Sequence, residues 1–290
     1  MPFSLEFIMQ DLRKFYKIYL PFRDKHLLPR APGSRNRKSK MPNIHIMAIM
    51  ILSHLFCGGN FRVFYQGIVR RYMKKHFRNL VSYSWFIRLR QRIFMDLFFY
   101  LKYKSVPNGD CFFIDSTPIK VCHNKRIKRH KTFKGLASRG HHSMGWFFGF
   151  KLHVIINNDG ELVKFKVTRG NTSDIKGLEM TKNLEGLLVG DKGYISQEWE
   201  KYLEKQNLKL ITKTRKNMKP KPRTYREKFF LSRRSIIETA FSQMKAWGLQ
   251  NTKLRSFYGW ILNLLSSLSA FVIQPFKPSA HIIKNLLIRN

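Results

Sequence analysis

Three carboxylates, Asp115, Asp191 and Glu238, occupy positions that suit metal-assisted phosphoryl transfer. Asp115 and Asp191 each follow a short apolar run directly, as expected for an acid at the end of a buried strand. Strand ends are where open α/β sheets bind their ligands. Glu238 lies in a segment with helical apolar spacing, and it shares one face with Arg234 and Lys245, four residues before it and seven after it.

Phosphodiester chemistry explains why these residue types are needed. Two Mg²⁺ ions about 3.5–4 Å apart can clamp the attacking and leaving oxygens of an in-line displacement. Mg²⁺ prefers oxygen ligands, and three carboxylates brought together repel one another unless a cation lies between them. We therefore predict that Asp115, Asp191 and Glu238 are both the catalytic residues and the ligands of two Mg²⁺ ions, which Mn²⁺ can replace. Arg234 and Lys245 would hold DNA phosphates beside them.

Each of these acids also has an ordinary structural alternative. An Asp at the end of a strand often caps a turn or a helix, and Glu238 can pair with Arg234 one helical turn away. Asp174, which follows Gly170-Asn171-Thr172-Ser173, is the natural substitute if one assignment is wrong, and its own alternative is a helix N-cap.

The charge of the chain points to nucleic acid as its partner. Lys and Arg number 55 against 17 Asp and Glu, a formal net charge of +38, and such a field attracts a polyanion. A hydrophobic content of 43% excludes a disordered basic tail. The three cysteines form no CxxC pair, which favours free thiols in a reducing compartment.

No segment fits a signal peptide or a membrane span. Residues 1–10 lack a charged start followed by an apolar run. The apolar stretch 260–276 is interrupted by polar residues and is shorter than the ~20 residues that a span needs. We expect a cytoplasmic protein with no membrane partner.

The first hundred residues predict a small basic all-α domain. Apolar spacing indicates helices over residues 3–19, 44–57, 61–77 and 82–102, and no acid lies between Asp24 and Asp96. We assign residues 1–105 to a helical DNA-binding domain. The proline-rich, basic segment 21–42 is either a solvated arm or an arm that contacts DNA.

Strands begin near residue 110. The pattern predicts strands over 111–115, 148–156 and 162–168, a helix over 174–184, a strand over 187–191, a helix over 197–206 and a strand over 208–212. Three antiparallel strands followed by alternating helices and strands are typical of the RNase H-like fold. We predict an α/β catalytic domain over 106–275, with a mixed five-stranded sheet flanked by helices, and a C-terminal tail over 276–290.

Two acid-free basic segments adjoin the predicted site. Residues 123–145 lie between the first two strands, and residues 213–226 precede the Glu238 helix. Either segment can be a solvated loop, but their connections to site elements favour DNA contact. The predicted DNA-binding side chains are Arg126, Arg129, Lys131, Lys134, Lys192, Arg234 and Lys245.

Five segments carry a family resemblance: residues 113–118, 145–153, 168–171, 188–194 and 234–238. They resemble bacterial insertion-sequence transposases of the DDE type, most closely the group named after insertion sequence 982, over residues 40–275. The resemblance implies an RNase H-like core, DNA transposition and a metal-dependent triad at Asp115, Asp191 and Glu238. A related group has a Tyr where this chain has Leu231.

The predicted function is that of a transposase. It would bind the terminal inverted repeats of its own element, cut at the ends and join the freed 3′-OH to target DNA. It would act as a homo-oligomer on DNA ends, at the nucleoid of a bacterial cytoplasm. Two rivals remain open from sequence: an RNase H-like metal nuclease that only hydrolyses, and a decayed, non-catalytic transposase remnant that only binds DNA.

Overall fold

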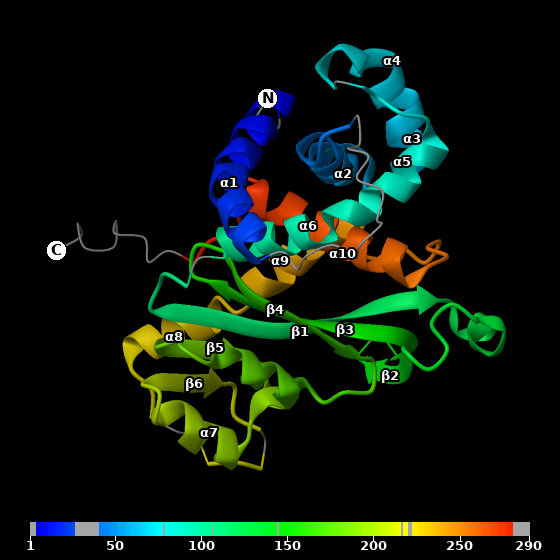
Figure 1. The fold of residues 1–290 in the computed structure, drawn as a ribbon. Helices are drawn as coiled ribbons and strands as arrows, with labels where there is room; N and C mark the ends of the chain where they lie inside the picture. The colour runs from blue at the N-terminus through cyan, green and yellow to red at the C-terminus, as the bar shows by residue number, and fades with distance from the viewer. Residues whose placement is uncertain are drawn as a thin grey trace. The chain divides into compact units, whose positions relative to one another are not determined.

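The chain folds into two compact units, each described by itself. The computed structural model describes residues 4–26, 41–77, 79–105, 107–143, 145–215, 217–219 and 222–280 (Figure 1). The helical unit comprises Met1–Lys104 and Met244–Pro275, and the sheet unit comprises Ser105–Gln243 and Phe276–Asn290.

The helical unit places a late helix among early ones. Its longer helices are α1 (Leu5–His26), α2 (Asn43–Cys57), α5 (Tyr83–Leu89), α6 (Phe94–Lys104) and α10 (Phe257–Ile273). The apolar α10 packs against α2 and α6, so the chain returns to this unit after the sheet. Short segments connect the longer helices: α3 (Phe61–Val63), the π-helix η1 (Phe64–Val69), α4 (Arg70–Tyr72), and the 3₁₀ helices η2 (Lys74–His76) and η3 (Arg90–Ile93).

α1 is longer than predicted. It continues through Pro21 to His26, although we expected it to end at residue 19. Aromatic packing explains the extra turns, because the ring of Phe22 lies 5.5 Å from that of Phe99 and 4.4 Å from that of His26. This packing offsets the hydrogen bond that a proline removes from a helix. Most of the predicted basic arm, residues 27–40, lies outside the described residues.

In the described part of the chain, no single helix has the length and apolar character to cross a membrane. Among the described residues, one pair of helical segments, Asn43–Cys57 and Phe61–Tyr72, bent by 112°, meets such a test together, on length and composition alone.

The sheet unit has the strand order and directions of an RNase H-like core. Its six described strands are β1 (Cys111–Cys122), β2 (Ser138–His142), β3 (Gly145–Asn157), β4 (Leu162–Arg169), β5 (Gly186–Gly190) and β6 (Leu208–Thr212). The order is β2-β3-β1-β5-β6, with β4 also paired to β3. β3 is antiparallel to β1, β2 and β4, whereas β5 is parallel to β1 and to β6. The predicted fold class is confirmed, with one strand more than the five expected.

The additional strand, β2, arises because β1 and β3 extend well beyond the predicted strands. Residues 138–142 pair with 145–149 at the start of β3. β1 accommodates Pro118 because its pairing with β5 ends at Phe113, so that its later residues pair on the β3 side only. The long strands carry the basic segment 123–137 at their far end.

Helices cover both faces of this sheet. Phe112 and Ile114 belong to a buried cluster with Leu178 of η5 (Asp174–Thr181) and Leu203 of α7 (Gln197–Glu204). On the other face, the ring of Phe113 lies 6.3 Å from that of Phe230 in α8 (Tyr225–Ser232). Side chains alternate along a strand, so Asp115 follows Phe113 toward α8 and α9 (Ser235–Ala246), while Ser116 follows Ile114 toward η5.

Candidate active site

Arg234 brings two of the predicted carboxylates together. Its guanidinium donates from Nη2 to Glu238 Oε1 at 2.6 Å, and its Nη1 lies 3.6 Å from Asp115 Oδ2. Asp115 comes from β1 and Glu238 from α9, so this contact joins elements that are far apart in sequence. Asp115 and Arg234 are each about one-fifth exposed, whereas Glu238 reaches solvent. The predicted pairing of Glu238 with Arg234 is therefore present, and it includes Asp115 as well.

Asp191 lies at the end of the neighbouring strand. β1 and β5 pair in register from Cys111 with Leu187 to Phe113 with Val189. Continuing this register by two residues places Asp191 opposite Asp115, and adjacent strands lie about 4.8 Å apart. Asp191 is exposed, directly before the short 3₁₀ helix η6 (Lys192–Tyr194), and its side chain makes no capping hydrogen bond there.

The pKa of Asp115 records this crowding of acids. It is raised from 3.8 to about 6, chiefly by burial and also by the negative charges of Asp191 and Asp174. Two contacts act in the opposite direction: the backbone N–H of Ser116, which donates to Asp115 Oδ1 at 2.8 Å, and the positive charge of Arg234. Asp115 therefore lies in a partly buried, negatively charged setting that Arg234 compensates only in part.

Tyr194 places a buried hydroxyl near the same acids. The residue is 1% exposed, and its hydroxyl has no hydrogen-bond partner in the described structure. Burial raises its pKa well above the usual range, and Asp115, Asp174 and Asp191 raise it further. Gly190 makes room for this ring, because a Cβ there would lie 3.1 Å from Tyr194 Cδ2 and 3.2 Å from Ile114 Cγ2. Packing against Tyr194 and Ile114 therefore explains why a glycine precedes Asp191.

Asp174, the predicted substitute carboxylate, lies on the η5 side of the sheet. Its Oδ1 accepts hydrogen bonds from Ser116 Oγ at 2.6 Å and from Lys151 Nζ at 3.0 Å. The Lys151 side chain is only 9% exposed. Ser116 and Lys151 were not singled out from sequence, although both lie inside the family-like segments, and a lysine within the apolar run of β3 is the signal that could have identified Lys151.

The donor chemistry of this site suits a hard divalent cation, but the ligand set is not assembled. Carboxylate oxygens are the preferred protein ligands of Mg²⁺. A bound cation would also relieve the electrostatic repulsion between Asp115 and its neighbouring acids. Among the described residues, however, no three His, Cys, Asp or Glu side chains gather closely enough to hold a metal ion. Arg234 supplies the positive charge between Asp115 and Glu238 instead.

Most of the predicted DNA-binding residues face solvent, and Arg234 faces the candidate carboxylates. Arg126, Arg129, Lys131 and Lys134 are exposed, and in the described structure none of them forms an ion pair. Phe133 anchors their segment, because it is buried and stacks on His130 with ring centroids 5.5 Å apart. Lys192 is also exposed, and Lys245 is exposed in the last turn of α9. Arg234 alone turns toward the carboxylates.

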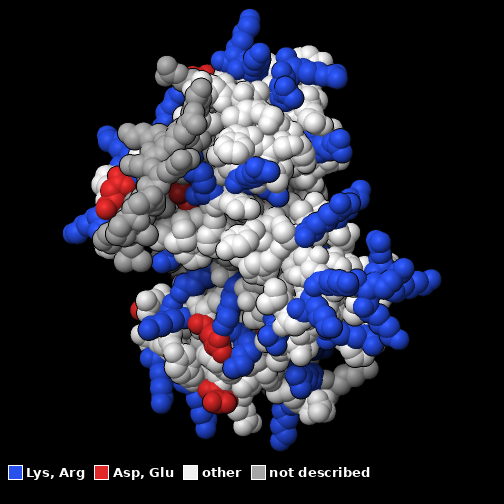
Figure 2. Space-filling model, turned by 45° about the vertical axis from the view of Figure 1, so that its right-hand side comes forward, with Lys and Arg blue, Asp and Glu red and all other residues white. Residues whose placement is uncertain are grey.

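The surface around these residues is strongly basic. Figure 2 shows Lys and Arg side chains projecting over much of the visible face, with Asp and Glu at only a few places. Trp146 adds an aromatic surface, since it is 54% exposed and its ring lies 4.7 Å from the Arg139 guanidinium. His141 packs edge-on against the same ring at 5.1 Å, which gives this histidine a packing role.

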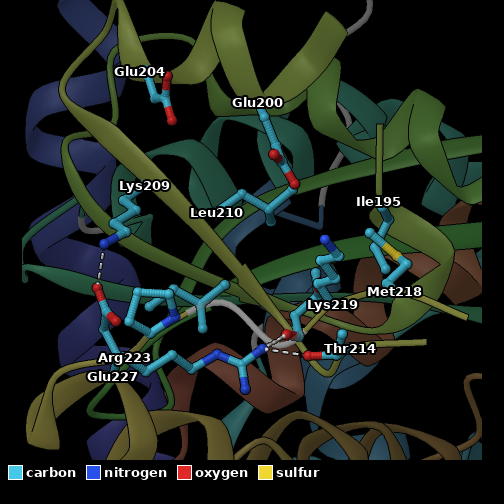
Figure 3. Close-up of a pocket in the computed structure, with 13 residues that line it drawn as sticks. Ile195, Glu200, Glu204, Lys209, Leu210, Thr214, Met218, Lys219, Arg223 and Glu227 are labelled. Atoms are coloured by element: carbon cyan, nitrogen blue, oxygen red, sulfur yellow. Dashed lines mark hydrogen bonds and ion pairs between the residues drawn. The ribbon is translucent and has the colours of Figure 1, made fainter. Parts of the chain in front are cut away.

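A separate pocket beside β6 does not match the predicted chemistry. It has a volume of about 290 Å³ and brings carboxylates of α7 and α8 near basic side chains (Figure 3). Its charges are largely satisfied internally: Lys209 pairs with Glu227 at 2.6 Å, and Arg223 donates to the Thr212 carbonyl and to Thr214 Oγ1. None of the three predicted catalytic acids lines it.

Comparison with known proteins identifies the family of the chain. The family model described as the transposase DDE domain matches residues 106–257, more than half of the chain. No curated protein matches the sequence. Similar solved structures include a piggyBac transposase synaptic complex with hairpin DNA, at 12% identity over 92% of this chain and 72% of that chain with a TM-score of 0.49. The Mos1 mariner paired end complex with Mn is 11% identical over 91% of this chain and 87% of that chain, with a TM-score of 0.27. By its family match, the chain belongs to the transposase DDE domain family.

Proposed function

We propose that this protein is an insertion-sequence transposase that binds the terminal inverted repeats of its element and catalyses metal-dependent strand cleavage and strand transfer. The observation that carries the proposal is the joining of Asp115 and Glu238 through Arg234, with Asp191 at the end of the strand next to Asp115. The family match supports the reaction class. Membership of the group named after insertion sequence 982, and a bacterial nucleoid location, are parts of the same proposal.

Asp115, Asp191 and Glu238 would hold the divalent ions, Mg²⁺ by preference with Mn²⁺ as a substitute. When bound, such ions neutralise charge on the scissile phosphate and lower the pKa of the attacking water. The residues of the chain position these groups: Gly190 and Tyr194 fix the turn that carries Asp191, and the Ser116 N–H orients the Asp115 carboxylate.

Arg234 has two roles in this proposal. In the structure it compensates Asp115 and Glu238, which lowers the repulsion that clustered carboxylates would otherwise suffer. With divalent ions held by the carboxylates, the Arg234 guanidinium would be available to pair with a phosphate oxygen, for which its planar fork is well suited. Arg234 would therefore pair with the acids in the metal-free protein and with a DNA phosphate in the complex.

The exposed cations Arg126, Arg129, Lys131, Lys134, Lys192 and Lys245 are proposed to contact the DNA backbone. Phosphate contacts of this kind fix the register of the duplex without reading its sequence. Two copies on two DNA ends would form the working assembly, so that the proposed active form is a homo-oligomer.

A strand-transfer assay tests the proposed function. Purified protein is mixed with a duplex that ends in the inverted repeat flanking its own reading frame, with supercoiled target plasmid and with Mg²⁺. We expect cleavage at the end of the repeat and joining of the donor 3′ end to the plasmid, both mapped by sequencing. Cleavage without joining would favour a nuclease, and DNA binding without cleavage would favour a decayed remnant.

A further inference from the structure

A basic cavity in the helical unit has no role in the proposed chemistry. It has a volume of about 570 Å³ and lies between the C-terminal end of α2, the segment 59–62, the α5–η3 region and the segment 250–255. Four cations line it: Arg62, Arg90, Lys253 and Arg255. No Asp or Glu is among its lining residues, and among the described residues none of the four cations forms an ion pair. We call it the Arg90 pocket.

Arg90 is the residue in this pocket that most needs a partner. It is half-buried, and among the described residues no hydrogen bond or ion pair of its guanidinium is found. Burial lowers its pKa from the usual value, which shows that the charged form is poorly solvated. Such a guanidinium would gain from an anionic ligand, because charge-assisted hydrogen bonds are among the stronger ones.

The position of Arg90 makes an anion the fitting partner. Arg90 Nη2 lies beside Gly259 in the first turn of α10, only 3.2 Å from the position that a Cβ atom would take on this glycine. Ser256 caps this 17-residue helix, and the N-terminal end of a helix is itself positive and favours anions. Arg90 thus lies close to this positive helix end, and no negative side chain of the chain lines the pocket.

The walls of the pocket are firmly built. His54 Nδ1 lies 2.5 Å from the Trp247 carbonyl oxygen, and this joins the end of α2 to the segment after α9. A Cβ on Gly248 would lie 2.2 Å from the Gly58 carbonyl oxygen, so the two backbones approach as closely as glycine allows. These contacts hold the C-terminal end of α2 next to the segment after α9, from which the chain continues to Lys253 and Arg255.

We propose that the Arg90 pocket binds a phosphate group of the DNA backbone. This inference rests on the proposed function for the identity of the polyanion. It assigns to Lys253 and Arg255, which lie far from the N-terminal helices in sequence, a place in the same DNA contact as Arg62 and Arg90. The ligand chemistry is a phosphate oxygen held by the guanidinium and ammonium groups that line the pocket.

The test uses full-length protein carrying Asp115→Asn, without divalent metal, so that only binding is measured. Affinity for duplex DNA is followed by fluorescence anisotropy from about 50 to 200 mM salt. Arg90→Gln should reduce the slope of log K against log salt by about 0.9 and weaken binding on the order of tenfold at about 0.1 M salt. Arg90→Lys, which keeps the charge, should retain most of the slope.

Arg92→Gln is the matched control. Arg92 lies in the same short helix and loses the same charge on substitution, but it is exposed and lines a different cavity. Equal effects of Arg90→Gln and Arg92→Gln would overturn the proposal in favour of overall charge. Arg255→Gln, at an exposed residue of the pocket, should reproduce the Arg90 effect without disturbing a half-buried side chain.

Two further readouts complete the test. If Arg90→Gln lowers the unfolding temperature of the DNA-free protein, Arg90 is structural and the proposal fails. Inorganic phosphate is added at constant ionic strength in a second arm: an Arg90-dependent thermal shift with unchanged DNA affinity would assign the pocket to free phosphate instead. Because no cleavage is measured, failure of the pocket and failure of the proposed transposase activity are separate results.

Discussion

The Arg234 guanidinium donates a 2.6 Å hydrogen bond to Glu238 Oε1 while its other terminal nitrogen lies near Asp115. A positive side chain therefore stands where the proposed cations would bind. We predict that Arg234→Gln binds Mn²⁺ several-fold more tightly without DNA, because the competing charge is gone, and that it cleaves end DNA more slowly. Mn²⁺ binding is measured by electron paramagnetic resonance.

The control for Arg234 is its neighbour Arg233, which is exposed and stacks on Phe229 at 5.5 Å. Arg233→Gln should leave Mn²⁺ affinity unchanged. Weaker Mn²⁺ binding in Arg234→Gln would show that the guanidinium supports the carboxylates as a ligand set and does not compete for them.

Neutral replacements of the proposed triad should separate chemistry from binding. Asp115→Asn, Asp191→Asn and Glu238→Gln keep side-chain size but remove charge that holds cations. Cleavage of end DNA should fall by orders of magnitude, while DNA affinity is kept or increased because a negative charge near phosphates is removed. Asp159→Asn, on the β3–β4 turn, is the control and should cleave normally. Cleavage by Asp115→Asn at close to the wild-type rate would refute the site.

The raised pKa of Asp115 predicts a pH-dependent stability. Because its pKa in the folded protein is about 6 against an ordinary 3.8, the folded state binds more protons between these values. Stability due to this group is therefore highest at low pH and is lost as pH rises through about 6. The difference between these two pKa values corresponds to about 3 kcal/mol of folding stability, since one pKa unit is worth about 1.36 kcal/mol.

This pH effect is measured by urea unfolding of the metal-free protein. The stability of wild type relative to Asp115→Asn should fall between about pH 4 and pH 7, because the variant cannot titrate there. Taking the difference removes the contributions of other groups. A difference that stays constant across this range would place Asp115 in a solvated setting.

The contact between Asp174 and buried Lys151 predicts a ranked set of stability losses. Ser116→Ala removes one hydrogen bond and should cost about 1 kcal/mol. Asp174→Asn leaves the Lys151 ammonium buried without a counter-charge and should cost more, about 2–4 kcal/mol. In a Lys151→Met background, Asp174→Asn should cost much less, as a double-mutant cycle by urea unfolding would show. Additive losses would mean that the two charges do not interact.

The basic segment after β1 should contribute to DNA affinity by neutralising backbone phosphates. Replacing Arg126, Arg129, Lys131 and Lys134 by Gln should lower the salt dependence of binding by about 0.9 for each phosphate that the protein no longer neutralises. The matched control replaces four exposed cations of α1, namely Arg13, Lys14, Lys17 and Lys25. An equal change in both quadruple variants would attribute DNA binding to net charge alone.

Local pattern was enough to predict the fold class. Three local patterns carried this prediction: the alternation of apolar residues in β3, the short buried run of β5 and the apolar stripe of the helix around Glu238. Each pattern repeats within a few residues, so it can be recognised from a short stretch of sequence. These runs place Asp191 correctly, directly after β5, whereas Asp115 lies within β1 and not at the strand end that was predicted. The boundaries were less predictable: β1 extends to Cys122, and α1 passes through Pro21, because pairing and aromatic packing outweighed local propensity.

Contacts between distant residues came only from the tertiary structure. The apolar run around Lys151 suggests that its side chain is buried, but it does not identify Asp174 as the partner. Nothing near Arg90 in the sequence shows that it lies beside the first turn of α10. The sequence offered the pairing of Arg234 with Glu238 as a structural alternative, but the contact of Arg234 with Asp115 depends on how α9 packs over β1. Such contacts follow from the joint burial of whole faces, which no short stretch of sequence encodes.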